Sequence, residues 1–104
     1  MPGIQHIVVV KFKPDVSEET IDDLFAQLAE LQQLIPGITH FSGGPYSSHE
    51  GLNQGFTHAF VMTFASTQAR DNYLPHPEHE RVKAAILPQI SEFVIFDYEL
   101  PGGE

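Results

Sequence analysis

The sequence contains no cysteine and few basic residues, and each shortage excludes a class of function. A chain without cysteine has no disulfide scaffold, no thiolate metal site and no cysteine nucleophile. Lysine and arginine together number 5 against 14 acidic residues, which gives a formal net charge of −9 at pH 7. Because nucleic acids and anionic membranes are bound by clustered positive charge, neither is an expected partner.

Long apolar runs are also absent from the sequence. No run approaches the roughly 20 residues that a membrane-spanning helix needs, although 41% of the residues are hydrophobic, as in folded globular proteins. The first residues lack the basic segment and the small-residue cleavage site of a signal peptide. We therefore expect a soluble, cytoplasmic protein, and its 104 residues fit one domain spanning residues 1–104.

Four segments have the composition of β-strands, being rich in β-branched and aromatic residues. They cover residues 4–13, 38–46, 56–64 and 92–100. In the second segment, Gly43-Gly44-Pro45 predicts a bulge or bend, because glycine and proline interrupt regular strand pairing. The polar segment 47–55 is expected to be a loop.

Two helical regions separate these strands. Ser17 is a suitable N-cap for a first helix that Pro36-Gly37 ends. Its apolar residues recur at helical spacing: Ile21, Leu24, Phe25, Leu28, Leu31 and Ile35. A short helix is expected over residues 67–73, followed by a proline break and a second helix that begins at Pro77. One stripe of that helix is expected to carry His79, Val82, Ile86 and Ile90.

The order of elements predicts an α+β fold of ferredoxin-like βαββαβ topology, with two helices on one face of a four-stranded antiparallel sheet. The opposite face is then left bare. It is expected to carry Ile7, Val9, Ala59 and Val61, with either Phe93 and Ile95 or Val94 and Phe96. A contiguous apolar face normally binds a partner, and the simplest cover is a second copy of the same sheet. We therefore predict a homodimer in the form of a dimeric α/β barrel.

Three of the six histidines fall on faces that point inward. His6 and His58 lie on the bulky faces of the first and third strands, and His79 lies on the buried stripe of the last helix. We expect these imidazoles to converge inside one subunit, with Tyr73 beside them. A buried histidine is more often a hydrogen-bonded core residue than a catalyst, but three of them with a tyrosine would need many partners if they served packing alone. Both interpretations stay open.

Metal and nucleotide sites are not expected. His76 and His79 are three residues apart, a spacing that metal pairs use, but no carboxylate or cysteine pattern completes a site. Gly43-Gly44-Pro45 lacks the glycine spacing and the following helix of a phosphate-binding loop. No serine occupies a nucleophile elbow. We predict no metal and no cofactor, and we interpret His40 and His49 as exposed loop or edge residues.

Five segments together match the pattern of a known family. The most specific is the Tyr-x-x-His-Pro-x-His motif of residues 73–79. The others are residues 6–13, 35–38, 55–58 and 96–98. On these residues the sequence resembles the stress-responsive A/B barrel (Dabb) family over nearly the whole chain. The resemblance implies a ferredoxin-like homodimer that forms an α+β barrel, in a family whose members mostly have no assigned reaction.

The sequence is also similar to plant polyketide cyclases of this family, which close a linear chain by aldol condensation. The likeness implies that His79 is the general base and that Tyr73 donates a hydrogen bond to the substrate, without metal or cofactor. It implies a small hydrophobic pocket for an apolar carbonyl compound, with substrate-binding residues His6, Val8, Phe25, Leu28, His58, Phe60, Met62 and Leu74. The residues that differ in bulk from the cyclases are Leu28, Phe60, Met62, Leu74 and Pro75.

Two alternatives to a cyclase come from other functional classes. One is a non-catalytic, stress-responsive dimer whose histidines are satisfied internally. The other is a cofactor-independent monooxygenase, because such enzymes share the dimeric barrel. Fold alone does not decide among the three.

Overall fold

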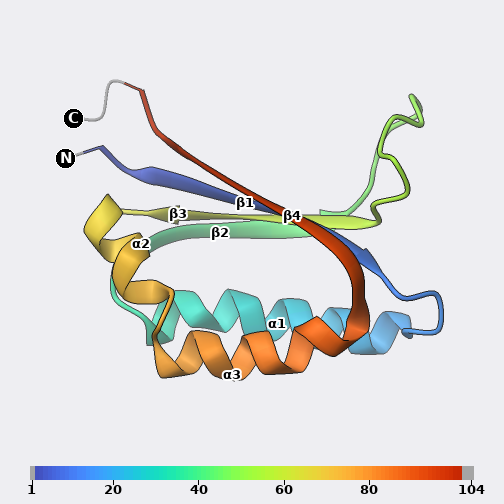
Figure 1. The fold of residues 1–104 in the computed structure, drawn as a ribbon, viewed down its shortest axis with the longest axis horizontal. Coiled ribbons are helices and arrows are strands. Elements are labelled where there is room, and N and C mark those ends of the chain that lie inside the picture. The colour runs from blue at the N-terminus through green and yellow to red at the C-terminus, as the bar shows by residue number, and fades with distance from the viewer. Residues whose placement is uncertain (1, 102–104) are drawn as a thin grey trace.

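The computed structural model describes residues 2–101, which form four strands and three α-helices in the predicted order. The elements are β1 (Ile4–Phe12), α1 (Glu18–Leu34), β2 (Ile38–Pro45), β3 (His58–Phe64), α2 (Thr67–Tyr73), α3 (Pro77–Ile86), a 3₁₀ turn η1 (Leu87–Gln89) and β4 (Ile90–Glu99). The strands form one sheet in the order β2-β3-β1-β4, and all neighbours are antiparallel. This is the predicted ferredoxin-like fold. Figure 1 shows α1 and α3 side by side beneath the sheet, with α2 at one end.

Helix α1 forms where the sequence predicts it. The Ser17 hydroxyl accepts a hydrogen bond from the backbone N–H of Thr20 at 3.1 Å, and two acidic residues in the first turn complement the helix dipole. The residues that α1 buries are Leu24, Leu28 and Leu31. The chain then turns at Gly37, whose φ of 94° is a conformation that favours glycine.

The second helical region is broken as expected. Helix α2 is capped by the Ser66 hydroxyl, which accepts from the Ala69 N–H at 3.1 Å. Helix α3 starts at Pro77, and the His76 ring caps it by accepting from the Glu78 N–H at 3.1 Å. The prediction that Ile90 shares a helical face with His79, Val82 and Ile86 is wrong, because α3 ends at Ile86 and Ile90 is the first residue of β4. Pro88 has no N–H to continue the helical bonding, and it lies in the 3₁₀ turn.

The irregularity in β2 lies elsewhere than predicted. The register shifts between Ile38 and His40, whereas residues 43–45 pair regularly with β3. Gly43 has a packing role instead, since a Cβ atom there would lie 2.7 Å from side-chain atoms of both Phe25 and Phe60. Glycine thus lets α1 approach this strand closely.

The two faces of the sheet have different surroundings. In β1 every second residue from Ile4 to Phe12 is buried beneath the helices, which is the period of a strand covered on one side. Ile7 and Val9 point to the other face, where they pair with Phe96 and Val94 of β4. The second of the two predicted sets is therefore the one on the uncovered face, which consists of Ile7, Val9, Ala59, Val61, Val94 and Phe96. We call it the open face.

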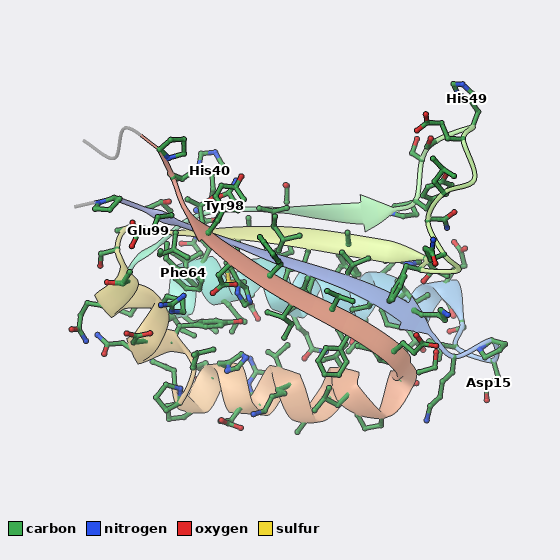
Figure 2. The ribbon with its side chains drawn as sticks, turned by 45° about the horizontal axis from the view of Figure 1, so that its top comes forward. Asp15, His40, His49, Phe64, Tyr98 and Glu99 are labelled. Carbon is green, nitrogen blue, oxygen red and sulfur yellow. The ribbon has the colours of Figure 1, made fainter. Side chains whose placement is uncertain are left out.

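Strand β4 lies at the edge of the sheet, as Figure 2 shows, and it carries exposed apolar residues on both faces. Val94 and Phe96, on the open face, are 50% and 62% exposed. Phe93 and Ile95 point to the helix side and are 50% and 53% exposed. Within residues 2–101, no helix is long and apolar enough to cross a membrane.

Candidate active site

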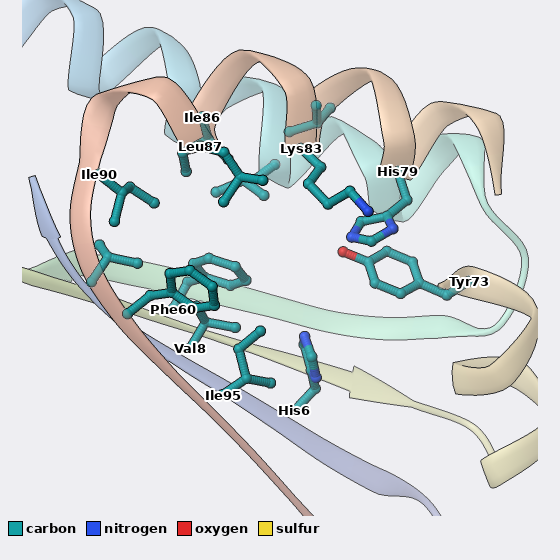
Figure 3. Close-up of a pocket in the computed structure, with 14 residues that line it drawn as sticks. His6, Val8, Phe60, Tyr73, His79, Lys83, Ile86, Leu87, Ile90 and Ile95 are labelled. Carbon is teal, nitrogen blue, oxygen red and sulfur yellow. The ribbon is translucent and has the colours of Figure 1, made fainter. Parts of the chain in front are cut away.

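A cavity of about 210 Å³ lies between the helix-covered face of the sheet and α3 (Figure 3). Its wall is mainly aliphatic and aromatic, and four side chains bring polar groups to it: His6, Tyr73, His79 and Lys83. The rest of the lining is Val8, Val10, Leu28, Phe60, Val82, Ile86, Leu87, Ile90, Phe93 and Ile95. A concave, largely apolar site with a few convergent polar groups is the usual form of a small-molecule site.

Tyr73 and His79 are in direct contact at one end of this cavity. Their ring centroids are 4.2 Å apart with an interplanar angle of 37°. A continuous helix would leave residues six positions apart on different faces. The break between the two helices removes this restriction, because Tyr73 ends α2 and His79 lies in the first turn of α3.

Tyr73 is almost fully buried, with 2% of its surface exposed. Burial strongly raises the pKa of its phenol, so the hydroxyl keeps its proton at neutral pH. This hydroxyl forms no hydrogen bond with any residue of the described part of the chain, and Figure 3 shows it directed into the cavity. It is therefore a free donor for a bound molecule.

His79 is held in one tautomer by the backbone. Its Nδ1 lies 2.8 Å from the carbonyl oxygen of Leu74, which can only accept, so Nδ1 carries the proton. Burial lowers the pKa of His79, the hydrogen bond to Leu74 opposes this, and the charge of Lys83 lowers the pKa further. The ring is therefore neutral at pH 7, with Nε2 free to accept a proton.

His6 faces the same cavity from β1, and charged groups outside the cavity hold its ring. Nδ1 of His6 lies 2.7 Å from Oδ1 of Asp97, and Nη1 of Arg70 lies 2.9 Å from Oδ2 of the same carboxylate. The ring centroids of His6 and Tyr73 are 6.1 Å apart. Since Nδ1 is engaged by Asp97, Nε2 is the ring nitrogen of His6 that is left for a ligand.

His58 does not join the other two imidazoles. It lies with Phe25 at a second cavity of about 270 Å³, next to Glu18 and Asp22 of α1. The centroids of the His58 and Phe25 rings are 5.7 Å apart. Burial lowers the pKa of His58, and the two carboxylates oppose this effect. The expected convergence of three imidazoles is therefore wrong.

The other predicted substrate-binding residues divide in the same way. Val8, Leu28 and Phe60 line the cavity of Tyr73 and His79. Met62 is 0% exposed in the core and does not line it, and Leu74 is 43% exposed on the surface. Of the eight predicted substrate-binding residues, four line this cavity, namely His6, Val8, Leu28 and Phe60. The other four, Phe25, His58, Met62 and Leu74, do not line it.

Sequence reasoning missed two groups of residues at the cavity. One is Asp97 with Arg70, which hold His6. Asp97 pairs with His6 across β1 and β4, and this neighbour could have been found only with the strand register. The other is the apolar wall that α3, η1 and β4 supply. Phe93 and Ile95 of β4 carried a signal, namely an apolar residue at every second position of a predicted edge strand.

The remaining histidines do not form a metal centre. Nδ1 of His76 already accepts the capping hydrogen bond of α3. His40 and His49 are exposed, and Figure 2 shows His49 at the tip of the loop between β2 and β3. Within residues 2–101, no three histidine, aspartate or glutamate side chains are grouped so that they could hold a metal ion.

The site thus combines the two kinds of group that proton transfer requires. His79 supplies a neutral, oriented base, Tyr73 supplies a protonated donor in contact with it, and most of the surrounding wall is apolar. In such surroundings a hydrogen bond to a developing negative charge is stronger than in water.

Comparison with known proteins gives matches over nearly the whole chain. The protein is 34% identical over 96 residues to the stress-response A/B barrel domain-containing protein HS1 of Arabidopsis thaliana, which covers 92% of this chain and 88% of that protein. It is 26% identical over 96 residues to olivetolic acid cyclase of Cannabis sativa, which covers 92% and 95%.

Solved structures match the fold closely. Hydroxynitrile lyase from Passiflora edulis superimposes with a TM-score of 0.91 at 25% identity, covering 97% of this chain and 95% of that one. A ferredoxin-like protein from Jannaschia sp. CCS1, described as dimeric, superimposes with a TM-score of 0.83 at 24% identity and covers 94% and 99%. The model of the stress responsive A/B barrel domain matches residues 4–100, so the chain belongs to the Dabb family.

Proposed function

We propose that the protein binds an apolar carbonyl compound in the cavity of Tyr73 and His79 and catalyses a cofactor-free, aldol-type reaction on it. The observation that carries this proposal is the contact between the two side chains at the wall of an apolar cavity. A neutral imidazole with a fixed tautomer and a protonated phenol are the base and the donor that enolate chemistry requires.

The proposed reaction needs only these two groups. Nε2 of His79 takes a proton from the carbon next to the carbonyl, and the C–H electron pair forms an enolate whose oxygen accepts a hydrogen bond from Tyr73. The enolate carbon then attacks a second carbonyl of the same molecule, which forms the new C–C bond. His79 returns its proton to the resulting alkoxide, so no oxidant, reductant or cofactor is consumed.

The comparisons support an enzyme of this general kind. One relative is named as a cyclase, and one protein of the same fold at 25% identity is named as a hydroxynitrile lyase. The fold therefore hosts more than one named reaction, and the lining of the cavity decides which compound enters.

We further propose that the protein works as a homodimer through the open face. Val94 and Phe96 are at least half exposed there, beside apolar residues of β1 and β3. A patch of this kind seldom stays in contact with water. The description of the Jannaschia protein as dimeric supports a homodimer.

Turnover of a poly-β-keto compound tests the catalytic roles. His79→Ala should lower kcat by roughly 10²-fold or more, the scale of a lost general base, and Tyr73→Phe should also lower kcat because the enolate loses its donor. His49→Ala is the matched control, since His49 is exposed on a distant loop, and it should keep full activity.

The same variants distinguish catalysis from a purely structural role. If His79 only packs and hydrogen-bonds, His79→Ala should cost about 1–2 kcal/mol of unfolding free energy and leave turnover of the folded protein unchanged. Unfolding by urea and sedimentation of each variant separate the two results. A folded, dimeric His79→Ala protein with full turnover would rule out the proposed base.

A further inference from the structure

Lys83 is the only lysine, arginine, aspartate or glutamate in the lining of the Tyr73–His79 cavity. It lies four residues after His79 on α3, so both side chains share one face of the helix. Figure 3 shows the Lys83 side chain running toward the His79 ring. A cation thus stands at the polar end of a cavity whose other walls are apolar.

The packing of the protein does not require this charge. Nζ of Lys83 lies 3.1 Å from Oε1 of Glu80, but the two side chains are 43% and 50% exposed. Ion pairs with such exposure contribute little to stability. The ammonium can therefore leave Glu80 for a stronger partner at small cost.

A lysine at the wall of a cavity is unusual in a chain with so few basic residues. The sequence has 5 lysines and arginines and 14 acidic residues. Arg70 is occupied by Asp71 and Asp97, and Lys11 and Arg81 pair with carboxylates of the protein outside the cavity. An anion approaching this acidic protein is repelled overall, so a local cation at the cavity is what allows it to bind there.

We propose that the compound bound in the cavity carries a carboxylate close to its reactive carbonyl, and that Lys83 binds this carboxylate and so determines specificity. This inference rests on the proposed function of the cavity. The apolar part of the compound lies against Ile86, Leu87 and Ile90, and the carboxylate meets the ammonium. Since Lys83 stands beside His79, the carbonyl that reaches Tyr73 is only a few atoms from the carboxylate. The substrate class is that of apolar β-oxo acids.

Binding of octanoate and octanamide tests the role of Lys83. The two compounds have the same apolar chain and nearly the same shape, and only the first is charged. Titration calorimetry at pH 8 and low salt keeps His79 neutral, because burial lowers its pKa. We expect the wild-type protein to bind octanoate about tenfold more tightly than octanamide, the scale of one charge-assisted hydrogen bond.

Two variants with the same net charge separate the effect of the Lys83 charge at the cavity from the effect of the net charge of the protein. Lys83→Met keeps the apolar stem and should abolish the preference for octanoate without weakening octanamide. Lys13→Met changes the net charge equally at an exposed residue outside the cavity, and it should keep the preference. Loss of the wild-type preference at 0.5 M salt would agree with an ionic contact.

The outcomes distinguish this inference from the proposed function. Equal binding of the two compounds by the wild-type protein, or a preference that persists in Lys83→Met, overturns the role of Lys83 and leaves the cavity as a site for neutral carbonyl compounds. If octanoate, octanamide and 2-nonanone all fail to bind, the proposed function is overturned together with the inference.

Discussion

The tautomer of His79 is fixed by a backbone carbonyl rather than by a carboxylate. The Leu74 oxygen accepts from Nδ1 at 2.8 Å and adds no full negative charge to the ring. A carboxylate in that position would hold the imidazole protonated, whereas the carbonyl orients it and burial keeps it neutral.

The lowered pKa of His79 predicts how activity and stability depend on pH. An unfolded histidine binds its proton near pH 6.5, and folded His79 binds it only at lower pH, so stability is fully present above pH 6.5 and is lost as pH falls. Turnover depends on the neutral form of His79 in the folded protein. It should therefore be level from pH 7 to 8 and fall as the pH drops through the lowered pKa of His79, below 6.5. Urea unfolding at pH 7.5 and pH 5 should show a smaller decline for His79→Asn than for the wild type. An equal decline in both proteins would contradict the lowered pKa.

Residue patterns located Tyr73 and His79 but misplaced His58, for a geometric reason. Strand alternation identifies the face of a residue and not its position along the strand. His6 pairs with Met62, and His58 pairs with Val10, four residues further along. At about 3.3 Å per residue the two histidines are about 13 Å apart on the same face. The register, which decides this, cannot be read from one strand's pattern.

At the scale of elements, the site depends on how the loops hold α2 against the sheet. Gly37 ends the turn after α1 with φ of 94°, and a Cβ there would lie 2.6 Å from the Cβ of Ala69 in α2. Helix α2 ends at Tyr73, so this close approach helps to fix the tyrosine. Capping residues and prolines predicted both helices here, because they act within one turn of the chain. The irregularity of β2 was predicted at residues 43–45 and lies between Ile38 and His40, because its position depends on the pairing with β3.

Gly37→Ala should therefore destabilise the protein, by about 1–3 kcal/mol, because it combines an unfavourable backbone conformation with a steric overlap. Gly44→Ala is the matched control. A Cβ at Gly44 meets no atom within 4 Å and its φ is not positive, so its effect should stay within about 0.5 kcal/mol. Urea unfolding of both variants gives the comparison. Equal stability of the two would show that the approach of α2 to Gly37 is not tight.

At the scale of the whole molecule, the ferredoxin-like topology leaves one side of the sheet uncovered. The helices α1 and α3 lie on the same face, and β4 at the edge carries exposed apolar residues on both faces. Figure 2 shows this strand from another direction. A chain of 104 residues buries only about two-thirds of the surface its unfolded state exposes, so a second copy adds burial that one copy lacks. Alternation predicted the members of this face in β1 and β3. The choice of Val94 and Phe96 over Phe93 and Ile95 in β4 required the register with β1.

Phe96→Glu should convert the proposed dimer into a monomer. Phe96 is 62% exposed at the centre of the β4 contribution to the open face, and two copies of a buried, unpaired carboxylate at a symmetric interface are unfavourable. Leu34→Glu introduces the same charge at a residue of α1 that is 42% exposed, away from that face, and should leave the dimer intact. Sedimentation at low micromolar concentration measures the oligomeric state of both variants.

The unfolding midpoint of the wild type should also rise with protein concentration, as it does for any dimer, while that of Phe96→Glu should not. A monomeric wild type, or a Phe96→Glu protein that still dimerises, would show that the open face is not the interface.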